Sequence, residues 1–227
     1  HSKMLERHVL PGQVVIGSDS HTPHSGAVGC VAFGVGTTAI FNSWLTKDVR
    51  LKVPPSVLIR VNGRKPVNVT AKDFMLQILR HPYVKSGRAI GKIVEYAGDA
   101  VRALSIDERA TMTNMAAEVG AFTGIIAPDA VTVDYLVRER GLPRPEVEAM
   151  LAGLFSDPDA DYEEVIDIDA AASRPFVPPD GTDDACRTAF NCDTGTFWHG
   201  THVAGIVAAI DNATGVAAMM EIAEALK

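Results

Sequence analysis

The stretch Val15-Ile16-Gly17-Ser18-Asp19-Ser20-His21-Thr22 decides how the whole chain is interpreted. An apolar, β-branched run ends in three adjacent polar side chains: a carboxylate, a hydroxyl and an imidazole. A run rich in glycine follows as far as Thr38. This pattern is typical of a buried strand that carries chemistry at its carboxyl end, where ligands bind in open α/β sheets. The stretch therefore predicts a ligand site at the end of a strand.

Strand-like and helix-like segments alternate from this stretch to about residue 170. The apolar runs 56–63 and 89–96 predict strands, and the second of them ends in the carboxylate of Glu95. Thr70, with Asp73 three residues later, predicts a capped helix that begins just after Thr70. Such alternation favours an α/β fold, in which a mostly parallel sheet is flanked by helices.

A change of composition divides the chain into three parts. Residues 1–173 form the predicted α/β domain. Residues 174–192, rich in proline and aspartate, are expected to be a linker. Residues 193–227 form a tail, which we expect to end in a short helical appendage.

The bulk composition is that of an ordinary globular protein, with 47% hydrophobic and 22% charged residues in a chain of 227. A net charge of −7 argues against nucleic acid and anionic membranes as partners. No apolar run approaches the roughly 18 to 20 residues that span a bilayer. Three cysteines, Cys30, Cys186 and Cys192, form no disulfide framework and indicate reduced thiols in a cytoplasmic protein. If the chain is secreted, a disulfide between Cys186 and Cys192 is an alternative.

Two strand ends thus carry polar groups that could form one pocket. Asp19, Ser20 and His21 would supply hydrogen-bond donors and a general acid–base pair, with Glu95 facing them from the second strand. Such a pocket suits a polyanionic substrate. The alternative is that the Ser-Asp-Ser-His-Thr run is only a helix-capping turn. Spacing alone leaves both interpretations open.

Six collinear segments match one known family and make the first interpretation specific. They are His1 with Glu6 and Pro11-Gly12, Gly17-Ser18-Asp19-Ser20-His21-Thr22, Phe33-Gly34-Val35-Gly36-Thr37-Thr38, Ala71-Lys72-Asp73, Ile93-Val94-Glu95-Tyr96-Ala97-Gly98, and Arg109 to Met115 with Glu118, Gly120 and Ala121. With these segments, residues 1 to about 175 resemble the large subunits of the aconitase/3-isopropylmalate dehydratase family. The fold implied is an aconitase-like α/β/α domain.

The resemblance implies a hydro-lyase that removes water from, and adds it to, a hydroxy di- or tricarboxylate. By the same resemblance, some residues are expected to be catalytic and others to bind the small carboxylate substrate. The expected catalytic residues are His1, His21 and Glu95. The expected substrate-binding residues are Asp19, Ser20, His21 and Asn114.

The family's cofactor is a four-iron, four-sulfur cluster held by three cysteines, one in a Ser-Cys-Thr-Asn segment and two in a Cys-x-x-Cys pair. Neither segment occurs in this sequence. We therefore expect no cluster and no metal site in this chain, and an activity that needs further segments. A partial fold of this kind would expose apolar surface, which favours a partner subunit or self-association.

A second resemblance lies near the C-terminus, at residues 190–216. The segment Trp198-His199-Gly200-Thr201-His202 and the apolar run after it resemble the histidine segment of subtilisin-like serine proteases. The resemblance implies that His199 is a general base oriented by Asp193, in a secreted protein. The nucleophile segment of that family is absent, so the serine is unassigned. A serine peptidase and a non-catalytic fragment or fusion product are therefore the two alternatives to the hydro-lyase.

Overall fold

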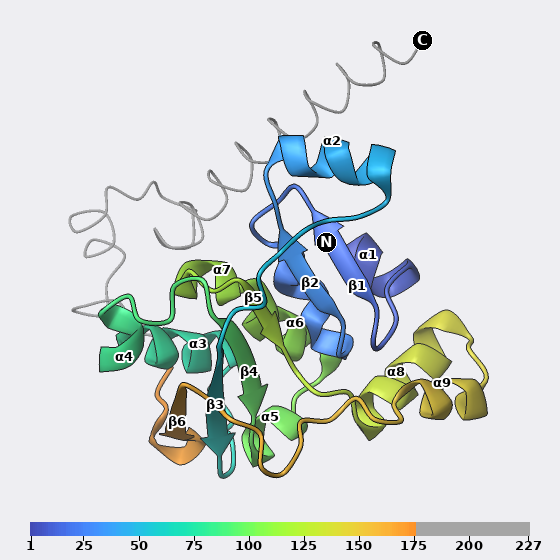
Figure 1. Cartoon of the computed structure of the whole chain (residues 1–227). Helices are drawn as coiled ribbons and strands as arrows, with labels where there is room; N and C mark the ends of the chain where they lie inside the picture. The colour runs from blue at the N-terminus through green and yellow to red at the C-terminus, as the bar shows by residue number, and fades with distance from the viewer. Residues whose placement is uncertain (176–227) are drawn as a thin grey trace, which may run out of the picture.

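The computed structural model describes residues 1–175, in which helices flank parallel sheets (Figure 1). This confirms the predicted α/β class. The elements in chain order are α1 (Ser2–Arg7), β1 (Val14–Gly17), the 3₁₀ helix η1 (Thr22–Val28), β2 (Val31–Gly34), α2 (Thr37–Thr46), β3 (Ser56–Asn62), α3 (Ala71–Arg80), α4 (Pro82–Lys85), β4 (Ile93–Ala97), α5 (Asp99–Arg102), α6 (Ile106–Asn114), α7 (Ala116–Val119), β5 (Thr123–Ile125), α8 (Ala130–Arg140), α9 (Arg144–Met150), β6 (Glu164–Asp169) and η2 (Ala170–Ala172). The predicted tail and its helix lie outside the described residues.

The strands form two separate parallel sheets. The larger has the order β5-β4-β3-β6, and the smaller pairs β1 with β2. The sequence had not indicated β2, a four-residue strand inside the glycine-rich run. β1 and β2 pair from Val14 with Val31 to Gly17 with Gly34, so the strand that precedes Asp19 belongs to the smaller sheet.

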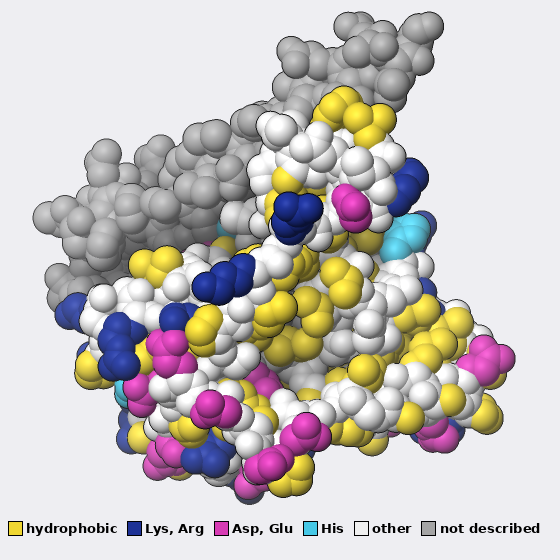
Figure 2. Space-filling view, viewed as in Figure 1, with side chains coloured by type: hydrophobic (Ala, Val, Ile, Leu, Met, Phe, Trp, Pro, Cys, Tyr) yellow, Lys and Arg dark blue, Asp and Glu magenta, His cyan; other side chains and the backbone are white. Residues whose placement is uncertain are grey.

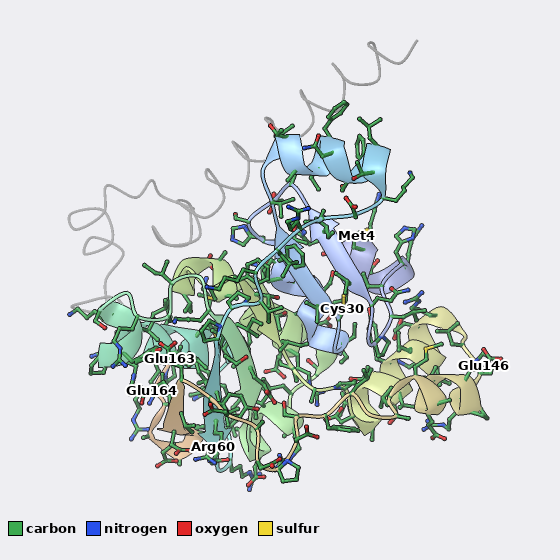
Figure 3. The ribbon with its side chains drawn as sticks, viewed as in Figure 1. Met4, Cys30, Arg60, Glu146, Glu163 and Glu164 are labelled. Carbon is green, nitrogen blue, oxygen red and sulfur yellow. The ribbon has the colours of Figure 1, made fainter. Side chains whose placement is uncertain are left out.

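The larger sheet buries one face against helices and leaves the other partly open. On β3, Val57, Ile59 and Val61 are fully buried, whereas the residues between them are not. The buried side packs against apolar residues of α3 to α7. Figure 3 labels Arg60, which lies on the other face and pairs with Asp167 at 2.8 Å. The period of two along each strand therefore decides which side chains can face the helices.

The two sheets meet where η1 packs directly on β5. A Cβ added to Gly26 would lie only 1.9 Å from the carbonyl oxygen of Gly124, so the two backbones touch. The Ile126 amide donates to the Gly26 carbonyl at 3.1 Å. Two side-chain hydrogen bonds cross the same boundary, from Thr123 to the carbonyl of Ala32 at 2.5 Å and from Thr113 to the carbonyl of His24 at 3.0 Å.

A buried arginine fixes α6 against the start of α8. Arg109 is 0% exposed, and its guanidinium donates to both oxygens of Asp129 at 2.8 and 2.7 Å. It also donates to the carbonyls of Leu104 and Arg102. Asp129 in turn accepts from the Val131 amide at the start of α8. Because the charge is paired and hydrogen-bonded, its burial orients the helix that carries Asn114.

We expect Gly26→Ala to destabilise the protein, because its methyl group would overlap the Gly124 carbonyl and force the two backbones apart. Overpacking of this kind costs about 1 to 3 kcal/mol. Urea unfolding should show a lower midpoint at an unchanged slope. Gly36→Ala is the matched control, because nothing lies within 4 Å of its added Cβ. Equal midpoints for the two variants would contradict the close contact.

Candidate active site

The turn between β1 and η1 is organised by the carboxylate of Asp19. Its Oδ1 accepts from the His21 amide at 2.7 Å and lies 3.1 Å from Nε2 of His1. The Thr22 hydroxyl donates to the Asp19 carbonyl at 2.6 Å, which closes the turn. Asp19 and His21 are both buried, at 8% and 6% exposure. The Asp19 carboxylate therefore contacts two histidines that the sequence analysis had named, the ring of His1 and the backbone of His21.

The His21 imidazole has a second carboxylate beside it. Its Nε2 lies 3.4 Å from Oε1 of Glu118, on α7, and its Nδ1 lies 3.2 Å from the Ser20 hydroxyl. A carboxylate next to an imidazole nitrogen fixes the orientation of the ring. Sequence reasoning had given Glu118 no role, although this residue stands in one of the six matching segments.

A third imidazole lies next to this pair. The His24 ring is centred 6.0 Å from the His1 ring, and its Nδ1 is a buried atom without a hydrogen-bond partner among the described residues. Burial lowers the pKa of His24 to about 4, with smaller contributions from the N-terminal amino group and from His21. His24 is therefore neutral near pH 7 and can donate or accept a hydrogen bond without adding charge.

These groups border a large cavity of about 1260 Å³ that runs along α6. His1 and His24 line it together with Asn114, Lys72 and Glu118. The structure thus brings Asn114 to the same cavity as His1. Ser20 is exposed and His21 lies behind the lining, in contact with Glu118. The predicted residues His1, Asp19, Ser20 and His21 form one cluster.

Glu95 is placed differently from our expectation. Its carboxylate accepts hydrogen bonds from the hydroxyls of Ser156 and Tyr162, both at 2.7 Å. Its neighbours on β4, Val94 and Tyr96, are buried against the helices, so Glu95 points to the opposite face of the sheet. The described contacts therefore do not join Glu95 to the Asp19 cluster, and Glu118 occupies the position beside His21.

The cysteine within the described residues does not fit a cluster ligand. Cys30, labelled in Figure 3, is completely buried, and burial raises the pKa of its thiol to about 12. Cluster ligands are thiolates. Within residues 1–175, no three His, Cys, Asp or Glu side chains are placed so that together they could hold a metal ion. The donor set in this part of the chain therefore does not fit the family's cluster, and no reaction step is assigned to one.

Four residues for which the sequence suggested a chemical role lie outside the described residues. They are Cys186, Cys192, Asp193 and His199. Their predicted roles stay predictions.

Comparison with known proteins identifies the family of this chain. The family model described as the aconitase family (aconitate hydratase) matches residues 1–188. The chain belongs to the aconitase family. The match ends before Asp193 and His199, so it gives the protease interpretation no support.

Curated relatives of this chain include 3-isopropylmalate dehydratase large subunits. The 3-isopropylmalate dehydratase large subunits of Streptococcus gordonii and Streptococcus sanguinis are 39% identical to this chain over 170 residues, and that of Bifidobacterium longum is 39% identical over 171. Each match covers 74% of this chain and 36% of the relative. The chain therefore spans about a third of the length of these curated relatives. Among the described residues, no helix is long and apolar enough to cross a membrane.

We expect the low pKa of His24 to make stability depend on pH. Between pH 6.5 and about 4 the unfolded chain binds a proton at His24, whereas the folded chain does not. The free energy of unfolding should therefore fall as the pH drops through this window, by on the order of 3 kcal/mol from this group. Urea unfolding at several pH values measures it. His24→Gln should flatten the curve and the exposed His8→Gln should not; equal curves would contradict the burial of His24.

The ¹⁵N chemical shifts of the His21 imidazole show whether Glu118 or Glu95 is the carboxylate beside it. Glu118→Gln removes the carboxylate beside Nε2, so the His21 signals should move. Glu95→Gln changes a side chain bound to Ser156 and Tyr162, so the same signals should stay in place. The opposite pattern would restore the original assignment of Glu95.

Proposed function

We propose that this chain is the part of an aconitase-family hydro-lyase that binds and orients a hydroxy di- or tricarboxylate. The observation that carries the proposal is the pairing of two imidazoles with two carboxylates beside one large cavity. Asp19 holds His1 and the backbone of His21, and Glu118 faces the His21 ring. Family membership and the dehydratase relatives support the same conclusion.

The reaction class explains why such pairs are useful. Loss of water breaks a C–O bond and a C–H bond on the adjacent carbon, and the hydroxyl leaves more readily when a proton reaches its oxygen. An imidazole that is oriented and kept protonated by a carboxylate can supply this proton near neutral pH. We assign this role to His21 with Glu118, and a parallel role to His1 with Asp19. Ser20 and Asn114 would donate hydrogen bonds to the substrate's carboxylates.

The proposal includes a partner. The relatives are named as large subunits, and this chain spans 36% of their length. We therefore propose that catalysis, in contrast to substrate binding, needs further protein, either a partner subunit or the segments that the longer relatives contain. We retain a cytoplasmic location as part of this proposal. The serine-peptidase alternative rests on Asp193 and His199 alone, and no described contact favours it.

Ligand binding to the isolated chain tests the proposal. Tricarballylate is a suitable probe, because it carries three carboxylates and has no hydroxyl to lose. In amide NMR spectra, it should shift the signals of Ser20, His21 and Asn114. His21→Ala should weaken the binding about tenfold or more, since a charge-assisted hydrogen bond is lost. His8→Ala is the control, because His8 is exposed.

Two results would contradict the proposal. One is a wild-type chain whose spectrum does not change with tricarballylate. The other is a set of shifts confined to exposed residues and unaffected by His21→Ala.

A further inference from the structure

A lysine in the same cavity has no role so far. Lys72 is half-buried and lines the cavity together with Asn114 and Glu118. It stands in the first turn of α3. Leu76 and Leu79 line the cavity too, and they follow Lys72 at helical spacing. Residues four and seven positions along a helix share its face, so this whole stripe of α3 is turned toward the cavity.

The position of Lys72 is fixed by its neighbours. The Asp73 carboxylate accepts from the amide and the hydroxyl of Thr70, at 2.7 and 2.8 Å, which closes a capping box. The next residues, Phe74 and Met75, are completely buried in the core. The backbone that carries Lys72 is therefore held from both sides.

A cation at this end of the cavity would attract the carboxylates of the proposed substrate. A substrate with two or three carboxylates would approach the carboxylates of Asp19 and Glu118, and like charges repel. His24 is neutral near pH 7 and cannot offset this repulsion. Lys72 interacts electrostatically with Glu118, while burial lowers the pKa of its ammonium group.

The other basic residues of the lining are less suited to this role. Arg138 belongs to α8 and donates to Glu139 at 2.6 Å, and Arg7 belongs to the last turn of α1. Glu118 is among the charges that act on Lys72. The cation beside the His21–Glu118 pair is thus Lys72.

We propose that Lys72 binds one carboxylate of the substrate and so determines which part of the molecule faces His21 and Glu118. This inference rests on the proposed function and adds a positioning and specificity residue to it. A lysine ammonium carries three donors on a flexible stem, so it can hold a carboxylate while remaining close to Glu118.

The test compares Lys72→Met and Lys72→Arg with the wild-type chain, again with tricarballylate and isothermal titration. Lys72→Met should weaken binding about tenfold or more, and Lys72→Arg should keep most of the affinity because it keeps the charge. Lys85→Met is the matched control, since Lys85 is an exposed lysine on α4 outside the cavity. The wild-type affinity should also fall with added salt, and that of Lys72→Met should fall less.

A purely structural role for Lys72 predicts something else. In that case Lys72→Met would lower the urea midpoint and disturb the His21 imidazole signals, and its binding would match the wild type once folded. That result, or unchanged affinity in a stable Lys72→Met variant, overturns the inference. If the wild type binds and His21→Ala abolishes binding while Lys72→Met does not, only the lysine assignment fails. If the wild type does not bind, the proposed function fails first.

Discussion

The backbone contact between η1 and β5 is the constraint on which the rest of the structure depends. Gly26 and Gly124 have no side chains, so the 3₁₀ helix after Asp19 can lie directly on the larger sheet. The hydrogen bonds from Ile126, Thr123 and Thr113 then fix the helix in this place. This approach brings His21, which follows a strand of the smaller sheet, to Glu118, which lies beside the larger one.

The site that results is a balance of charges rather than a single catalytic group. Two carboxylates hold two imidazoles, a third imidazole is kept neutral by burial, and Lys72 interacts electrostatically with Glu118. Such an arrangement can bind an anion and keep a proton available at the same time. Outside the site, the described surface exposes several large apolar side chains. Apolar side chains are exposed on α2, at the top of the coloured part of Figure 2, including Phe41, Trp44 and Leu45. Exposed apolar surface is consistent with a chain that spans 36% of its relatives.

The sequence predicted the fold class, and the structure differs from the sequence-based expectation at two places for physical reasons. Strand and helix patterns located β3, β4 and the start of α3, because periodicity and capping are local signals. β2 was missed because a short strand among small residues carries little periodicity. Glu95 was chosen because a carboxylate ends an apolar run, but the alternation of β4 turns it away from the helices. Glu118 meets His21 across 97 residues, a contact that no local pattern encodes.

A crystal structure of the chain with bound tricarballylate tests the central claim most directly. We expect one ordered ligand in the cavity along α6, with carboxylates within hydrogen-bond distance of His21 or Asn114 and of Lys72, and with Glu118 still beside His21. An ordered ligand bound elsewhere, or a Glu118 carboxylate turned away from His21 with the cavity empty, would contradict it.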